Sequence, residues 1–224
     1  MKILSFSGID GAGKSTQIGE LQAWLDRAGQ RTQLLTFWDN VVVGASFREF
    51  MSHKAFKGDR GIGSPEKPLH RRDKNVTSSP VTALRFCLYF ADAVNVCRKV
   101  RSLRKQDVDV VIFDRYIYDE LANLPLSGRL TRLFIRFVLA FVPQPDVAYV
   151  IDADPAAAFA RKPEYPADFL RKNREAYLTF SRLSGHMTVI EPLPVEEATI
   201  RVREAFLSKM PEPQAEFSGL PALP

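Results

Sequence analysis

The sequence predicts an α/β protein: a three-layer, doubly wound fold in which helices cover both faces of a parallel five-stranded sheet. Short apolar runs alternate along the chain with amphipathic segments of helical period, which is the pattern of strands joined by crossover helices. The run VVIF at 110–113 is apolar throughout, as expected of a parallel strand that is buried on both faces. A length of 224 residues favours a single domain.

The first strand is predicted at 2–8, where KILSFSG passes from apolar residues into glycine. A helix is expected over 13–28 because its apolar residues recur with helical spacing and Gly29 is a good stop signal. Its apolar face contains Ile18, Leu21, Leu25 and Ala28. A second strand is predicted at 31–37. Residues 38–78 are rich in Gly, Pro, Ser and charge, so we expect an irregular region with some helix near 47–54. Irregular regions as long as this one are often functional.

Pro80 is suited to the first turn of a helix, which we expect to run to about residue 105, and a central strand follows at 107–116. Residues 129–142 form a strong helical segment that is apolar almost all round, apart from Arg132 and Arg136. Such a helix is either deeply buried or part of a subunit interface. The remaining elements are a strand at 145–154, a helix from Pro155, a helix at 168–183, a strand at 186–191 and a helix at 195–209.

These elements predict one domain over residues 1–209, and residues 210–224 are expected to be a disordered tail because 211–224 hold four prolines. No apolar run reaches the ~18 residues of a membrane span, and the first residues lack the apolar core of a signal peptide. Cys87 and Cys97 would lie ~15 Å apart on one helix, too far for a disulfide, so we expect two buried thiols. A cytoplasmic location follows.

The net charge of +5 is concentrated locally, since residues 48–74 hold eight basic and four acidic residues. A nucleic-acid patch is one interpretation of this segment. Neither aromatic interleaving nor a known nucleic-acid module accompanies it. A solvated loop, or a loop that closes on phosphates, is the prediction instead, and we expect neither nucleic acid nor membrane as a partner.

The pattern Gly8-x-x-x-x-Gly13-Lys14-Ser15, between a predicted strand and a predicted helix, fits the P-loop that cradles nucleotide phosphates. Its glycines let several backbone N–H groups point inward, and the helix that follows adds its positive N-terminal end. Lys14 would reach the phosphates and the Ser15 hydroxyl would hold Mg²⁺. The predicted phosphate-binding residues are Gly8, Gly11, Ala12, Gly13, Lys14, Ser15 and Thr16. The fold is therefore predicted to be of the P-loop NTPase type, with a nucleotide as phosphate donor and Mg²⁺ bound beside it.

Two charged residues end the strand that runs to residue 116. Asp114 stands where P-loop enzymes place the acid that organises Mg²⁺. Arg115 follows at the mouth of the sheet, where ligands of open α/β folds bind. Its guanidinium suits a second, acceptor phosphate.

These motifs resemble the thymidylate kinase family. The resemblance rests on IDGAGKST at 9–16, the strand-end DRY at 114–116, the D-x-D-P at 152–155 and the segment 169–177 after a short basic stretch, and it extends with gaps over about residues 1–208. It implies ATP and Mg²⁺ as the phosphate donor and a nucleoside monophosphate as the acceptor, with dTMP the leading candidate. It is compatible with a homodimer, to which the helix over 129–142 would contribute.

The resemblance also implies roles for three further parts of the chain. An acid inside the P-loop contacts the acceptor's sugar hydroxyl in this family, and Asp10 matches that position. A mobile lid, matched here by residues 161–168, supplies arginines when the P-loop has none, as with Ala12 here. Arg161 is the first candidate for that arginine, and an arginine aimed at the transferring phosphoryl group is catalytic. The other candidates are Lys162, Arg171 and Arg174.

The acceptor side departs from the family pattern. The family's arginine-proline-glycine-glycine signature is missing within 38–78, where Arg48 is the nearest substitute at a different spacing. Tyr89 matches the aromatic residue that stacks on the base. Ala93 stands in place of the arginine that reads the base, and it cannot donate a hydrogen bond.

The sequence therefore predicts a kinase that transfers a phosphoryl group to a small molecule, with Lys14, Arg115 and Arg161 as catalytic residues and Asp10, Arg48, Tyr89 and Arg115 at the acceptor. Three alternatives stay open. The acceptor is a nucleoside or another metabolite; the protein is a nucleotide-gated switch, for which the N-K-x-D motif is missing; or it is an inactive family member that binds nucleotide.

Overall fold

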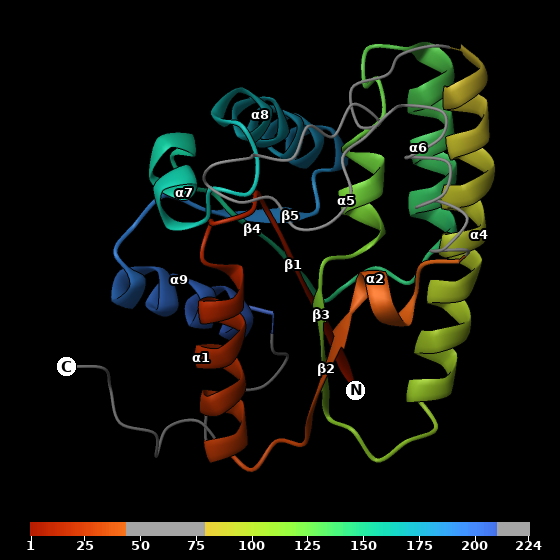
Figure 1. Ribbon diagram of the computed structural model, residues 1–224. Coiled ribbons are helices and arrows are strands. Elements are labelled where there is room, and N and C mark those ends of the chain that lie inside the picture. The colour runs from red at the N-terminus through yellow and green to blue at the C-terminus, as the bar shows by residue number, and fades with distance from the viewer. Residues whose placement is uncertain (44–78, 210–224) are drawn as a thin grey trace.

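The computed structural model describes residues 1–43 and 79–209, and its described strands form one parallel sheet of five strands in the order β2-β3-β1-β4-β5. The strands are β1 (Lys2–Ser7), β2 (Thr32–Thr36), β3 (Val110–Asp114), β4 (Val147–Ile151) and β5 (Met187–Ile190). Figure 1 shows β1 in the middle of the molecule with helices on either side. The predicted doubly wound α/β class is confirmed.

The central strands form because they are apolar enough to be covered on both faces. All five residues of β4 are buried, as are the first four of β3, and only Lys2 of β1 is half-buried. Parallel pairing sets Phe6 opposite both Asp114 of β3 and Tyr149 of β4. The carboxyl ends of β1, β3 and β4 therefore lie next to one another at one edge of the sheet, which is where open α/β folds bind ligands.

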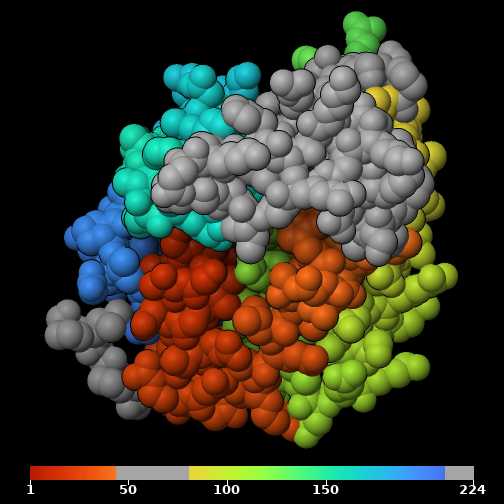
Figure 2. Space-filling view, viewed as in Figure 1, coloured from red at the N-terminus to blue at the C-terminus, as the bar shows by residue number. Residues whose placement is uncertain are grey.

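The long helices follow from the predicted amphipathic segments. The described ones are α1 (Lys14–Arg27), α2 (Phe37–Asn40), α4 (Ser79–Leu103), α5 (Ile117–Leu121), α6 (Arg129–Phe141), α7 (Pro155–Arg161), α8 (Ala167–Ser184) and α9 (Val195–Leu207). Helices α1 and α9 pack against each other on one side of the sheet, while α4 packs against α5 and α6 on the other (Figure 1). In Figure 2, residues 1–43 (red to orange) lie between α9 (blue) and α4 (yellow-green).

The predicted strands and long helices are confirmed to within a few residues, and two short helices were missed. Helix α2 falls inside the region that was expected to be irregular, and α5 follows Tyr116 directly. Each has five residues or fewer, too few to show a helical period. The predictions for residues 47–54, the basic segment 48–74, Arg48 and the tail 210–224 lie outside the described residues.

Helix α6 is not deeply buried. Thr131, Ile135 and Val138 face the core, whereas Leu130 is 70% exposed and Leu133 65% exposed. Of the two interpretations that the sequence left open, deep burial is therefore wrong, because the apolar residues of α6 occupy more of the helix surface than its contact with the core can cover. Its subunit-interface interpretation stays a prediction.

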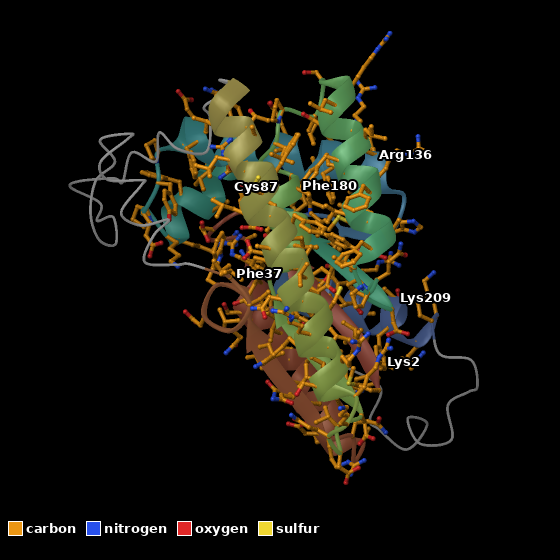
Figure 3. The ribbon with its side chains drawn as sticks, turned by 90° about the vertical axis from the view of Figure 1, so that its right-hand side faces the viewer. Lys2, Phe37, Cys87, Arg136, Phe180 and Lys209 are labelled. Carbon is orange, nitrogen blue, oxygen red and sulfur yellow. The ribbon has the colours of Figure 1, made fainter. Side chains whose placement is uncertain are left out.

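Aromatic rings join α6 to α4, which lie side by side in Figure 3. Phe86 stacks on Phe134 with ring centroids 4.2 Å apart, and Phe90 contacts both Phe137 and Phe141.

In the parts of the chain that the structure describes, no helix combines the length and apolar character needed to cross a membrane.

Both cysteines are free, as their spacing predicted. Cys87 is exposed on α4 (Figure 3), so the expectation of two buried thiols is wrong for this residue. Cys97 is half-buried and its Sγ lies 3.6 Å from the carbonyl oxygen of Phe141.

Candidate active site

The loop between β1 and α1 has the backbone shape of a phosphate cradle. Gly8, Gly11 and Gly13 have φ values of 139°, 80° and 92°, which side chains rarely allow. A Cβ at Gly8 would lie 2.4 Å from the carbonyl oxygen of Ile151, and one at Gly11 would lie 2.3 Å from that of Ala158. Glycine is therefore required both by the turn and by the close approach of β4 and α7.

Lys14 folds back over this loop. Its Nζ donates to the carbonyl oxygens of Gly8 at 3.0 Å and Ile9 at 2.9 Å, and the side chain is buried. Burial, with a smaller contribution from the positive charge of Arg115, lowers the pKa of Lys14 to about 7, although Asp10, Asp119 and Asp114 oppose this shift. A polyphosphate beside Nζ would favour its charged form, so the lysine is suited to binding a strongly anionic ligand.

The start of α1 is also suited to an anion. Gly13 is the N-cap, and its first turn holds no acidic residue. Within the described residues no side chain caps this end, which leaves the helix N–H groups and the positive end of the dipole facing the cradle. Ser15 and Thr16 are exposed at this turn.

Asp114 ends β3 beside the cradle. Its Oδ1 is buried, and no hydrogen-bond partner for it is present among residues 1–43 and 79–209. An acidic oxygen of this kind fits Mg²⁺ or a water bound to it. The described residues contain no group of three or more His, Cys, Asp or Glu residues that could hold a metal.

Arg115 follows Asp114 in a conformation that is unusual for a residue with a side chain. Its φ is 68°, and its backbone N–H donates to the carbonyl oxygen of Phe6 at 2.9 Å. The guanidinium points back towards the cradle, where Nη1 lies 3.4 Å from the carbonyl oxygen of Gly8. Burial opposes the charge of Arg115, but the surrounding Tyr177, Asp10 and Asp119 outweigh it and raise its pKa. The residue is therefore a fixed cation beside the phosphate loop.

Asp10, the acid inside the loop, faces that cation. Its Oδ1 accepts a hydrogen bond of 2.5 Å from Nη2 of Arg115, and its side chain stays partly exposed. The carboxylate inside the loop is thus paired with the residue that follows β3.

The basic residues around the segment 161–168 differ in what they contact. Arg161, at the end of α7, donates from Nε to the carbonyl oxygen of Gly11 at 2.9 Å. Arg174 is instead held by both carboxylate oxygens of Asp152, at 2.6 and 2.7 Å. The other two candidates pair with near neighbours: Lys162 with Glu164 at 3.3 Å, and Arg171 with Asp168 at 2.5 Å. Of these four, Arg161 is the one that touches the phosphate loop.

The predicted acceptor side is built on α4. Tyr89 is 9% exposed and Ala93 is fully buried. Asp92 and Asn95 on the same helix bind the backbone that leads into residues 44–78: Asp92 Oδ1 accepts from the N–H of Val43, and Asn95 Nδ2 donates to the carbonyl of Val41. Arg48 lies outside the described residues, so its position relative to Arg115 stays a prediction.

Sequence reasoning missed a buried group behind Arg115. Asp119 accepts hydrogen bonds from Ser7, Tyr116, Tyr177 and Arg115. The spacing of four residues between Arg115 and Asp119 was a usable signal, because it allows an ion pair across one helical turn. Tyr177 comes from α8, 62 residues beyond Arg115, and only the tertiary fold brings it here.

The chain is similar to curated thymidylate kinases along most of its length. It is 29% identical over 212 residues to a probable thymidylate kinase of Pyrobaculum aerophilum, a match that covers 91% of this chain and 95% of the relative. A thymidylate kinase of Bifidobacterium longum subsp. infantis is 28% identical, with 78% of this chain and 72% of the relative covered. No protein-family model matches the chain.

A solved structure shares the fold. The crystal structure of thymidylate kinase from Ehrlichia chaffeensis aligns with a TM-score of 0.55 at 18% identity, covering 92% of this chain and 97% of that one. The match therefore extends along most of both chains, and it shows a shared fold. The chain is therefore similar to thymidylate kinases in sequence along most of its length and shares the fold of one of them.

Proposed function

We propose that this protein is a nucleoside monophosphate kinase that transfers the γ-phosphoryl group of ATP to dTMP with the help of Mg²⁺. One observation carries the proposal: a cradle suited to phosphates, built on Lys14, and a fixed cation, Arg115, end adjacent strands of the sheet. Donor and acceptor phosphates would therefore meet at one edge. The names of the relatives support dTMP as the acceptor.

The donor would be held by the loop between β1 and α1. Backbone N–H groups of Gly11 to Thr16 and Nζ of Lys14 would bind the β- and γ-phosphates, once Lys14 leaves the carbonyl oxygens of Gly8 and Ile9. Ser15 and Asp114 would hold Mg²⁺, which neutralises charge on the phosphates when it is bound. Arg161 already lies on the loop through Gly11, close to where a γ-phosphate would be.

The acceptor would be held from the β3 side. Arg115 would bind its 5′-phosphate, and Asp10 would accept a hydrogen bond from its sugar hydroxyl. A phosphate oxygen of the acceptor then attacks the γ-phosphorus in line, and the bond from that phosphorus to the bridging oxygen breaks as ADP leaves. Catalysis rests on holding the two oxygens in line and on neutralising charge, because no covalent intermediate is needed.

One observation favours a second candidate, a P-loop kinase for a different acceptor. Ala93 is fully buried on α4 and has no side-chain donor for a base. A site that lacks the polar partner of a base discriminates poorly against other bases. This candidate shares the donor site and the role of Arg115, and differs only in what Tyr89 would face.

The experiment is a screen of ADP release with ATP and Mg²⁺ against all nucleoside monophosphates, nucleosides included as a second panel. We expect turnover with dTMP. Turnover with another acceptor alone would select the second candidate, and absence of turnover with every acceptor would contradict both.

The control for this screen is Lys14→Met, which keeps the length of the side chain and removes its charge. We expect this variant to fold, which cooperative thermal unfolding would show, and we expect it to lose turnover. A folded Lys14→Met protein that releases ADP at the normal rate would remove the assignment of the donor site.

A further inference from the structure

Asp119 is buried at the centre of a cluster of donors behind Arg115. It is 1% exposed. Its Oδ2 accepts from the Ser7 hydroxyl at 2.7 Å and from the N–H of Tyr116 at 3.0 Å. Its Oδ1 accepts from the Tyr177 hydroxyl at 2.6 Å and from Nη1 of Arg115 at 3.0 Å. Both oxygens are thus engaged twice, which satisfies a buried carboxylate fully.

The members of this cluster come from three separate parts of the fold. Ser7 ends β1, Asp119 lies in α5, and Tyr177 belongs to α8. Tyr116 is the N-cap of α5, and the carboxylate of Asp119 at the third position accepts from its backbone N–H, which helps to fix the start of this helix. The carboxylate therefore has little freedom to move, and it restricts the movement of the Arg115 guanidinium that it binds.

That group is one edge of the Arg115 guanidinium. Nη1 donates to Asp119 and also lies 3.1 Å from the Tyr177 hydroxyl oxygen. Nη2, the other terminal nitrogen of the guanidinium, donates to Asp10. Asp119 and Tyr177 are buried, whereas Asp10 is partly exposed. One edge is thus bound by the interior of the protein and the other is turned to a side chain that solvent and ligands can reach.

We infer that Asp119 and Tyr177 are positioning residues: they clamp the Nη1 edge of Arg115 so that its Nη2 edge is presented to the acceptor's phosphate, with Asp10 occupying that edge until the phosphate replaces it. The inference rests on the proposed function only for the identity of the ligand. Without the clamp, a long side chain on a residue with φ of 68° has other rotamers available. Binding of the phosphate would then also have to order the Arg115 side chain, which weakens the affinity.

The test uses Tyr177→Phe, which removes only the hydroxyl oxygen and keeps the buried ring of α8. Tyr149→Phe is the matched control, because Tyr149 of β4 is also buried. Its hydroxyl donates to the carbonyl of Val202 in α9 at 2.9 Å, outside the site. We expect Tyr177→Phe to raise the KM for dTMP about tenfold, because the variant loses a hydrogen bond to a charged group. The KM for ATP should stay within about twofold of wild type, and Tyr149→Phe should change neither.

A second variant, Asp119→Asn, has the same shape and replaces one acceptor oxygen by a donor. We expect it to raise the KM for dTMP more than Tyr177→Phe does, and to approach the effect of Arg115→Ala. If Asp119→Asn fails to fold, Tyr177→Phe decides alone. Equal dTMP KM values for wild type, Tyr177→Phe and Tyr149→Phe would overturn the inference and leave the proposed function standing.

A binding measurement separates this inference from the proposed function. With the phosphate loop saturated by Mg²⁺ and a non-hydrolysable ATP analogue, inorganic phosphate is titrated as the probe of the Arg115 edge. We expect wild type and Tyr149→Phe to bind it equally, and Tyr177→Phe and Arg115→Ala to bind it more weakly. This ranking would support the clamp even if dTMP proved not to be the acceptor, and equal binding by all four proteins would overturn it.

Discussion

The carboxylate of Asp10 lies 2.5 Å from Nη2 of Arg115, so the acid inside the phosphate loop pairs with the cation that follows β3. The two residues are 105 positions apart and meet because β1 and β3 are adjacent in the sheet. This pairing explains how an acid is tolerated inside a loop built for anions. The carboxylate is partnered by the guanidinium of Arg115, on the side where we propose the acceptor binds.

The role proposed for Asp10 predicts how the enzyme treats acceptors without a sugar hydroxyl. Since dTMP carries a single sugar hydroxyl, at the 3′ position, we expect wild type to favour dTMP over its 3′-deoxy analogue by ~10-fold or more in kcat/KM, the value of a hydrogen bond to a charged group. Asp10→Ala should lose most of this preference. Parallel assays of both acceptors measure it, with the exposed Asp168→Ala as control; an Asp10→Ala enzyme that still discriminates as wild type does would contradict the role.

The lowered pKa of Lys14 predicts proton uptake when nucleotide binds. The pKa is about 7 in the folded protein against an ordinary 10.5, so near pH 8 most molecules carry a neutral lysine that phosphates would recharge. We expect wild type to take up close to one proton more than Lys14→Met near pH 8, and much less near pH 6. Calorimetric titrations in two buffers of different ionisation enthalpy measure this number. Equal uptake by the two proteins at both pH values is the contrary result.

The same shift affects stability without ligand. Because the unfolded chain binds this proton up to about pH 10.5 and the folded chain releases it near 7, the contribution of Lys14 to the free energy of unfolding rises with pH across that window. The difference in unfolding free energy between wild type and Lys14→Met should therefore shift in favour of wild type as pH increases.

The contact of Arg161 with the phosphate loop predicts which lid residue matters for rate. We expect Arg161→Ala to lower kcat by about 10³-fold, as for arginines that stabilise a transferring phosphoryl group. Arg171→Ala is the matched control, since Arg171 is exposed and pairs with Asp168, and it should change kcat by less than about threefold. Steady-state kinetics at saturating dTMP and ATP give both values. A larger loss in Arg171→Ala would reassign the lid arginine.

The glycines of the cradle predict a contrast in stability. Gly11→Ala would place a Cβ 2.3 Å from the carbonyl oxygen of Ala158 at a φ of 80°, so we expect it to lower the free energy of unfolding by about 2 kcal/mol or more. Gly19→Ala, within α1, meets no atom within 4 Å and should raise it by about 0.5–1 kcal/mol. Urea unfolding of both variants measures the difference. Similar changes in the two proteins would show that the loop can move away from α7.

The sequence allowed the long elements and the donor site to be predicted because both depend on short-range patterns. Apolar runs and helical spacing predicted β1, α1 and β3, and the glycine spacing before Lys14 predicted the cradle. Short helices without a period, such as α5, gave no such signal. The exposure of Leu130 and Leu133 was also missed, because a helix that is apolar on most sides does not reveal which side the rest of the protein covers.

Asp10 was predicted from the family resemblance and Arg115 from its place at a strand end, and their pairing was not predicted. Tyr177 and Ser7 were not predicted at all as neighbours of Arg115, since nothing local marks a buried tyrosine or serine as a partner of a distant cation. The sequence by itself determined the phosphate cradle and the order of strands and helices. Only the tertiary structure decided which edge of Arg115 is held and which is presented, because hydrogen-bond partners of a buried cation are set by where four separate elements converge in space.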